Sequence, residues 1–286
     1  MQSEPDKQVV RAMNSVGPES NEPAVEVIGL TRRFESLTVV DHLQFSTAKG
    51  AIFGLLGPNG AGKSTLIKML TTLLPVTEGT ARVAGFDIVR QPREVRRRIG
   101  YVPQMLSADG ELTGYENLLI SAKLYGIPRA ERTERIGQAL EFMALTEARD
   151  RLVAHYSGGM VRRLEIAQAT MHRPAVLFLD EPTVGLDPIA KRSFWERIRD
   201  LRRGYNTTIF MTTHDMEEAE ILCEVVTLMN HGKIVASGSP IQLRATLGPE
   251  ASLDEVFVHY AGTSIAEAGG NLADVARTRL TARRLG

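Results

Sequence analysis

The 286-residue chain has few of the features that would indicate a secreted, membrane-spanning or nucleic-acid-coating protein. Its single cysteine, Cys223, excludes an intramolecular disulfide, suits a reducing compartment, and lies among apolar residues as a small buried side chain would. Lysine plus arginine equals aspartate plus glutamate, at 34 each, so no excess positive charge is present to hold a nucleic-acid backbone. No apolar run approaches the ~20 residues that a membrane-spanning helix needs. Any work at a membrane is therefore expected through a partner or a peripheral contact.

The chain does have a globular middle between two tails. Residues 1–24 are rich in serine, glutamate, proline and asparagine, so we expect a mostly disordered tail, and "MQSEPDKQVV" lacks the apolar core of a signal peptide. Residues 25–262 predict one folded domain. Residues 263–286 form a C-terminal extension, where a solvated helix end is favoured over contact with acidic lipid. The arginines of this extension are Arg277, Arg279, Arg283 and Arg284.

Hydrophobic periodicity predicts an α/β fold. The stretches "AIFGLLG", "AVLFLD", "TTIFMTT" and "VVTLM" are nearly continuous apolar runs, which is typical of strands covered on both faces. Residues 24–30 and 38–47 also favour strands, and "VVTLMNHGKIVASG" predicts a hairpin that turns at "NHG". Between about 105 and 160 the pattern is helical, with "TGYE" fitting a capping box. The sequence therefore predicts a sheet domain interrupted by a helical insert.

Residues 57–64, "GPNGAGKS", match the phosphate-binding pattern Gly-x-x-x-x-Gly-Lys-Ser between an apolar strand and a periodic helix. Glycines let the backbone aim several N–H groups at one anion, and the positive end of the following helix adds to the attraction. Lys63 supplies a charge for the outer phosphates, and the Ser64 hydroxyl is a candidate Mg²⁺ ligand. In this context an ordinary glycine turn is a poor alternative. The predicted binding residues are Gly57, Pro58, Asn59, Gly60, Ala61, Gly62, Lys63, Ser64 and Thr65.

Asp180 and Glu181 come directly after the apolar run "VLFL", at the carboxyl end of a predicted buried strand. Ligands of open α/β sheets bind at that edge. We expect Asp180 to hold Mg²⁺ through water, and Glu181, where the chain turns at Pro182, to polarise a water that attacks the γ-phosphate. An acidic pair alone is weak evidence, but this pair follows four apolar residues in a chain with a phosphate loop.

A second glycine-rich element, "YSGGM" at 156–160, lies about a hundred residues after the first. Ser157, Gly158 and Gly159 begin a predicted helix, where free backbone N–H groups and a serine hydroxyl bind anions. Taken alone, Ser157 would more simply cap its own helix. The neighbouring motifs favour the phosphate role.

Six motifs occur in one order within residues 25–260: "GPNGAGKS", "YVPQ", "YSGGM", "VLFLDEP", "GLDP" and "TTHD". In this order they resemble the nucleotide-binding subunit of an ATP-binding cassette (ABC) transporter. The resemblance implies a P-loop NTPase fold with a RecA-like, mostly parallel core sheet, an antiparallel β part and an inserted helical subdomain. It also implies an Mg²⁺-dependent ATPase at the cytoplasmic face of a membrane.

The resemblance assigns further roles one residue at a time. Gln104 is similar to the glutamine that touches Mg²⁺ and links the site to the helical insert, and His214 is similar to the switch histidine at the γ-phosphate. Phe34 resembles the aromatic residue that stacks on adenine, with Val40 packing nearby. Asp187 belongs to the nucleotide-binding "GLDP" motif.

In this family two domains pair head to tail, so that the "SGG" of one chain closes over phosphates held by the other. The resemblance therefore implies a homodimer, or a heterodimer with a sibling chain, around two ATP molecules. Tyr156 and Met160 replace the leucine and glutamine of the common "LSGGQ". "SGGM" followed by "RRLEIA" resembles a branch of exporters for drugs, polyketides and lipid-linked polysaccharides, whose membrane subunit is a separate chain.

That membrane subunit is expected to dock beside Gln104 and the helical insert, at residues 105–125. Leu106, Tyr115 and Tyr125 are candidates there, although core packing explains each of them equally well. Two other functions stay open. A soluble relative acting on ribosomes, DNA or cluster assembly is disfavoured, because the chain has no second cassette, no long coiled-coil insert and no basic character. A non-hydrolytic regulatory module is disfavoured because Glu181 and His214 are both present. The sequence does not name the cargo.

Overall fold

The computed structural model describes residues 22–248 and 250–262. The predicted N-terminal tail up to residue 21 and the C-terminal extension with its four arginines lie outside these ranges. Ala24, assigned to the tail on composition, belongs instead to the fold. It is 3% exposed, and its N–H donates to the Thr47 carbonyl at 2.8 Å, which extends the pairing of the first two strands by one residue.

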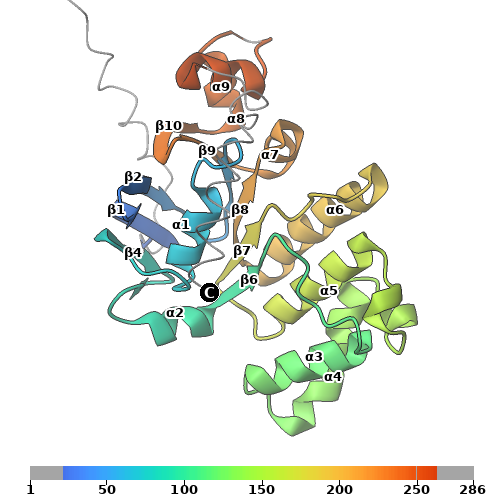
Figure 1. Ribbon diagram of the computed structural model, residues 1–286. Helices are drawn as coiled ribbons and strands as arrows, with labels where there is room; N and C mark the ends of the chain where they lie inside the picture. Colours follow the sequence, from blue (N-terminus) through green and yellow to red (C-terminus); the bar gives the residue numbers. More distant parts are fainter. Residues whose placement is uncertain (1–21, 249, 263–286) are drawn as a thin grey trace, which may run out of the picture.

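Six strands form the central sheet, in the order β10-β9-β3-β8-β7-β6 (Figure 1). They are β3 (Ile52–Leu56), β6 (Ile99–Val102), β7 (Val176–Asp180), β8 (Thr208–Thr213), β9 (Val225–Asn230) and β10 (Lys233–Gly238). All pairings are parallel except that of β10 with β9. Strands β3, β7 and β8 are buried throughout, which confirms the expectation from their continuous apolar runs.

The predicted hairpin joins β9 to β10 and turns at His231 and Gly232. Both residues have positive φ, 45° and 79°, as a two-residue turn between twisted strands requires.

Four further strands form an antiparallel sheet in the order β2-β1-β4-β5. They are β1 (Val25–Phe34), β2 (Leu37–Thr47), β4 (Glu78–Val83) and β5 (Phe86–Asp87). This sheet packs on one face of the central sheet through Phe45, whose ring centroid lies 5.3 Å from that of Phe53 and 6.1 Å from that of Phe210. The neighbouring residues Ile52 and Ile209 point to the other face, toward the helices, because successive strand side chains alternate.

The helical insert consists of α3 (Gly114–Leu124), α4 (Arg129–Phe142) and α5 (Gly158–Thr170). In Figure 1 it lies apart from the antiparallel sheet, on the opposite side of β6 and β7. The predicted capping box is present, since Thr113 Oγ1 accepts from Glu116 N–H and the Glu116 carboxylate accepts from Thr113 N–H. The helix face predicted from Ile136, Leu140 and Met143 is buried in the core.

The remaining helices connect or cover the strands: α1 (Lys63–Leu70), α2 (Pro92–Arg98), α6 (Pro188–Tyr205), α7 (Met216–Leu222), α8 (Pro240–Ala245) and α9 (Leu253–Ala261). Over the ranges the structure describes, no helix has the length and apolar character needed to cross a membrane. Cys223 is buried as expected, and this burial raises the pKa of its thiol.

Candidate functional site

The glycine-rich loop 57–62 connects β3 to α1 and is held by its neighbours. The Gly232 N–H donates to the Ala61 carbonyl at 2.9 Å. A Cβ at Gly57 would lie 2.1 Å from the Met229 carbonyl oxygen, and one at Gly62, where φ is 104°, would lie 2.6 Å from that of Val39. Glycine is therefore required at both positions. The loop leads into the first turn of α1, whose N–H groups have no acceptor within the helix and are free to bind an anion.

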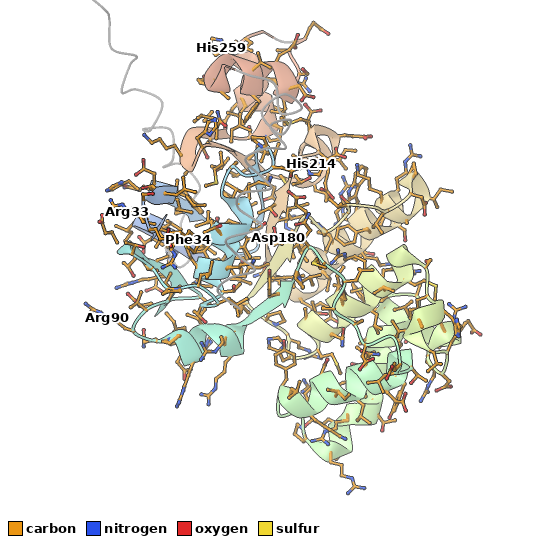
Figure 2. The ribbon with its side chains drawn as sticks, viewed as in Figure 1. Arg33, Phe34, Arg90, Asp180, His214 and His259 are labelled. Atoms are coloured by element: carbon orange, nitrogen blue, oxygen red, sulfur yellow. The ribbon has the colours of Figure 1, made fainter. Side chains whose placement is uncertain are left out.

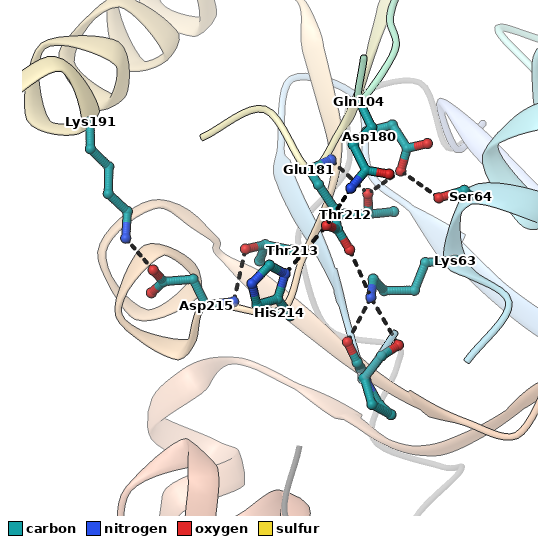
Figure 3. A network of polar contacts seen from close by, with 12 residues as sticks. Lys63, Ser64, Gln104, Asp180, Glu181, Lys191, Thr212, Thr213, His214 and Asp215 are labelled. Carbon is teal, nitrogen blue, oxygen red and sulfur yellow. Dashed lines mark hydrogen bonds and ion pairs between the residues drawn. The ribbon is translucent and has the colours of Figure 1, made fainter. Parts of the chain in front are cut away.

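Lys63 lies at the centre of the site (Figure 3). Its side chain is 4% exposed, and its ammonium donates to the carbonyls of Gly57 and Pro58 at 2.6 and 3.1 Å. The same nitrogen lies 3.0 Å from Glu181 Oε1. The cation is thus fixed between the glycine-rich loop and the acidic pair.

Asp180 ends β7, and its Oδ1 accepts from Ser64 Oγ at 3.0 Å and from Thr212 Oγ1 at 2.7 Å. Burial raises the pKa of this carboxyl, and the two hydrogen bonds oppose the rise. Over residues 22–248 and 250–262, no group of three or more His, Cys, Asp or Glu side chains could hold a metal ion. One hydroxyl and one carboxylate fit Mg²⁺, which commonly takes its other ligands from water and substrate phosphates.

Glu181 turns toward Lys63 because its own backbone is left-handed, with φ at 46°. Its N–H is anchored on Thr212, 3.0 Å from the hydroxyl and 3.1 Å from the carbonyl oxygen. Its Oε2 accepts a hydrogen bond from Gln104 Nε2 at 3.2 Å and lies 3.3 Å from His214 Nδ1. The sequence placed this turn at Pro182, whereas the structure places it one residue earlier.

Electrostatics keep the Glu181 carboxylate ionised. Burial alone would raise the pKa of Glu181, but the contact with His214 and the charge of Lys63 outweigh it and lower that pKa to about 2. His214 follows β8 and precedes α7, whose N-cap Asp215 also contacts Lys191 of α6. The contact with Glu181 raises the pKa of His214 against the opposing effect of burial.

The pKa of His214 is expected to fall when Glu181 is replaced by glutamine, because the negative partner of the imidazolium is lost. In the wild type the pair stabilises the fold below the ordinary histidine pKa of 6.5, and this contribution is lost as pH rises through the raised value. An NMR titration of the ring protons measures the shift. His172 is the control, since its ring contacts Ile99 and Tyr125 instead, and equal His214 titrations in both proteins would contradict the assignment.

The second glycine-rich element begins α5, where Ser157 Oγ accepts from Met160 N–H at 3.3 Å and so caps its own helix. Asp187 caps α6 in the same way, accepting from the N–H groups of Ile189 and Ala190. The N-termini of α5 and α6 are adjacent, since a Cβ at Gly159 would lie 2.9 Å from the Ala190 Cβ. Figure 1 places α5 away from α1, so residues 157–159 do not reach the phosphate loop of their own chain.

Phe34 and Val40 do not join the central cluster. Phe34 ends β1 in the antiparallel sheet (Figure 2), is 38% exposed, and carries the Arg32 guanidinium 4.4 Å from its ring centroid. Arg32 thus covers one face of the ring, and the stacking of adenine on Phe34 stays a prediction. Val40, predicted to pack near adenine, is fully buried in the core of the two sheets, so that prediction is corrected. The alternation of β2 turns this side chain inward, a consequence of strand register that the motif did not reveal.

Sequence reasoning missed Thr212. Its hydroxyl donates to Asp180 and accepts from the Glu181 N–H, so it fixes the two carboxylates relative to each other. The available signal was the pair of threonines before His214 in the apolar run "TIFMTT", because a polar residue buried in a strand needs a partner.

Comparisons with known proteins identify the family of this chain. Residues 40–184 match the family model described as ABC transporter. The chain is 43% identical over 225 residues to the daunorubicin/doxorubicin resistance ATP-binding protein DrrA of Streptomyces peucetius, covering 79% of this chain and 68% of that protein. It is 42% identical over 229 residues to the Nod factor export ATP-binding protein I of Sinorhizobium fredii, covering 80% of this chain and 66% of that protein.

Among solved structures, the chain resembles one titled "Structure of ATP binding subunit of ABC transporter", with a TM-score of 0.74 and 30% identity. That match covers 83% of this chain and 99% of the solved one. The range matched by the family model, residues 40–184, contains the glycine-rich loop, Lys63 and the acidic pair. The chain therefore belongs to the ABC transporter family, as an ATP-binding subunit.

Proposed function

We propose that this chain hydrolyses MgATP within a head-to-tail dimer and thereby drives export through a separate membrane subunit. The observation that carries the proposal is the convergence of Lys63, Asp180, Glu181 and His214 at one edge of the central sheet, beside a glycine-rich loop. These groups come from three separate segments of the chain, and each has the chemistry that hydrolysis of a phosphoanhydride needs.

Each residue has a distinct role in the proposed reaction. Lys63 and the N–H groups that begin α1 bind the β- and γ-phosphates. Ser64 and Asp180, with Gln104 nearby, would hold Mg²⁺, which when bound draws charge from the phosphate oxygens. Glu181 orients the attacking water and accepts its proton, and His214 holds the γ-phosphate side of the site.

A change of partner for Lys63 makes Glu181 a better base. With a pKa of about 2, the Glu181 carboxylate is ionised but weakly basic. Phosphate oxygens would compete with Glu181 Oε1 for the ammonium, which lies 3.0 Å away. Loss of that cation raises the pKa of Glu181 toward a more useful value. ATP binding would thus prepare its own hydrolysis.

A dimer completes the site in this proposal. Ser157, Gly158 and Gly159 lie at a helix start that stays away from the phosphate loop of the same chain. The free N–H groups of a helix start bind anions, so a second chain could supply them to the γ-phosphate. ATP would then hold two chains together, and its hydrolysis would release them.

The cargo class follows from the relatives. Their names concern daunorubicin and doxorubicin resistance and Nod factor export, and a further relative is the linearmycin resistance ATP-binding protein LnrL of Bacillus subtilis, 39% identical over 77% of this chain. We infer export of a drug, antibiotic or lipid-like molecule. The chain would then lie peripherally on the cytoplasmic face of the membrane, bound to its permease.

A cavity of ≈ 380 Å³ between β6, α3 and α5 is the proposed docking site of that permease. Leu124 and Tyr125 line it and are 81% and 40% exposed, and Leu106 nearby is 53% exposed. Tyr115, also predicted for this surface, packs partly buried against the core, and Arg149 covers its ring. Ser107, Ser121, Glu165 and Gln168 line the same cavity, so it offers both apolar and polar groups to a short amphipathic segment of a membrane protein.

A tagged full-length chain, isolated from mild-detergent extracts of its own host, is expected to co-purify with a polytopic membrane protein in near-equal amount. The purified complex should hydrolyse ATP, and Leu124→Glu should release the membrane protein while leaving the free chain folded, because the substitution places a charge on the docking surface. Glu134→Lys, on the exposed face of α4, is the control. If the tagged chain is recovered with ribosomes, or without any membrane protein, the transport role is contradicted. The ATPase activity of the chain is tested independently, by measuring its ATP hydrolysis.

A further inference from the structure

Two residues of α5 that the proposed reaction does not use form a buried ion pair. Arg162 Nη1 lies 2.9 Å from Glu165 Oε2, and both side chains are 2% exposed. Withdrawing two charges from water is costly unless further hydrogen bonds satisfy them. Both charges have such bonds, and all of those bonds go to a single loop.

The loop held in this way is residues 103–107, which follows β6. The Arg162 guanidinium donates to the Pro103 carbonyl at 2.7 Å and to the Gln104 carbonyl at 2.8 Å. At the other end of the loop, Glu165 Oε1 accepts from the Ser107 N–H and, at 3.0 Å, from the Ser107 hydroxyl. One guanidinium and one carboxylate thus fix both ends of a five-residue segment.

Little else holds this segment. Met105 and Leu106 are 82% and 53% exposed, so they contribute little packing. Gln104 lies at the tethered end, and its Nε2 donates to Glu181 Oε2 at 3.2 Å. The position of the Gln104 side chain in the reaction site therefore depends on where Arg162 holds the Gln104 backbone.

We propose that Arg162 and Glu165 are positioning residues for ATP hydrolysis, which fix segment 103–107 so that Gln104 stays in contact with Glu181. The pair touches no reacting atom and acts through Gln104. Ser107 and Glu165 also line the cavity assigned to the permease, so the pair joins the docking surface to the site. The inference rests on the proposed ATPase function.

The test uses the full chain with Arg162→Met and Glu165→Leu combined. Removing one partner alone would leave a buried uncompensated charge, whereas replacing both with apolar side chains of similar size is tolerated in buried ion pairs. Arg163→Met is the matched control. Arg163 lies on the same helix and also donates to backbone carbonyls, at 2.9 Å to Met143, 3.2 Å to Ala144 and 3.4 Å to Gly159, but none of these acceptors belongs to segment 103–107.

In the double variant, hydrogen exchange of the amides in 103–107 is expected to accelerate by about 10-fold or more, since Ser107 loses its acceptor. The kcat for ATP is expected to fall by about 10-fold, because Gln104 is no longer held in place. The KM for MgATP should change less than about twofold, since Lys63 and its loop are untouched. The control should move none of these three values.

A double variant with a kcat near that of the wild type, or with unchanged exchange in 103–107, would overturn the inference. Should this variant fail to fold, Arg162→Lys is measured in the same way, because an ammonium has a single nitrogen and lacks the fork by which Nη1 and Nη2 reach the two carbonyls. A wild-type chain without ATPase activity, alone or with its permease, would overturn the proposed function instead. Hydrogen exchange would still report whether the pair holds the loop.

Discussion

Replacing Glu181 with glutamine is expected to lower the kcat of ATP hydrolysis by about 100-fold or more while leaving ATP binding intact. The amide keeps the size of the side chain and can still accept from Gln104 and His214, but it cannot take a proton from water. Lys63 loses its negative partner in this variant, so it is free to hold phosphate. Binding should therefore be equal to that of the wild type or tighter.

Steady-state phosphate release and equilibrium ATP binding measure the two effects separately. Glu217→Gln is the matched control, because Glu217 lies three residues from His214 on α7 and is exposed. The same preparation tests the dimer: with MgATP, the Glu181→Gln variant should double its mass in light scattering, since it binds ATP without cleaving it. Turnover within about threefold of the wild type would remove Glu181 from its role as general base.

Replacing Lys63 with methionine is expected to weaken ATP binding by about 10- to 100-fold, the effect of losing a charged hydrogen-bond donor to phosphate. The same change leaves Glu181 buried, 5% exposed, without its cation. The low pKa of Glu181 contributes stability that is present above pH 4.5 and lost as pH falls through about 2, and Lys63 is one source of it. Unfolding free energy at neutral pH should fall by up to about 3 kcal/mol.

Combining Lys63→Met with Glu181→Gln separates these two effects. The double variant removes both charges, so most of the lost stability should return, while ATP affinity should stay low. Lys68→Met, on the exposed face of the same helix, is the control for the substitution itself. Calorimetry of ATP binding and urea unfolding measure the two quantities. An unchanged dissociation constant in Lys63→Met would contradict the role of Lys63.

The parts of the site that the sequence predicted are those fixed by local chain geometry. A glycine-rich turn between a strand and a helix can only place its N–H groups at the helix start, so the loop and Lys63 followed from "GPNGAGKS". The position of Asp180 followed from an apolar run that ends at the carboxyl edge of a parallel sheet, whereas the role of His214 came from the resemblance of the motif "TTHD".

The features of the site that the sequence did not predict depend on strand register and on long-range packing. Val40 points into the core because of how β2 pairs with β1, a pairing interrupted by irregularities that no motif encodes. The contact of Thr212 with Asp180 requires β7 beside β8, and the hold of Arg162 on segment 103–107 spans 58 and 59 residues of sequence. The letters "RRLEIA" contain both members of that ion pair, but not the loop that it serves.

Hydrogen bonds from the β9–β10 turn, which is itself bonded to β2, hold the glycine-rich loop in place. This support is expected to affect the rates of nucleotide binding and release. Gly232 holds Ala61 through its N–H, and its own carbonyl accepts from the Asp41 N–H at 2.9 Å, so the loop is supported before any ligand comes. A rigid cradle costs little ordering entropy on binding, so more of the free energy of nucleotide binding would remain to stabilise the proposed dimer. If the proposed dimer forms, the rate of nucleotide exchange should be set by separation of its two chains rather than by rearrangement of the cradle.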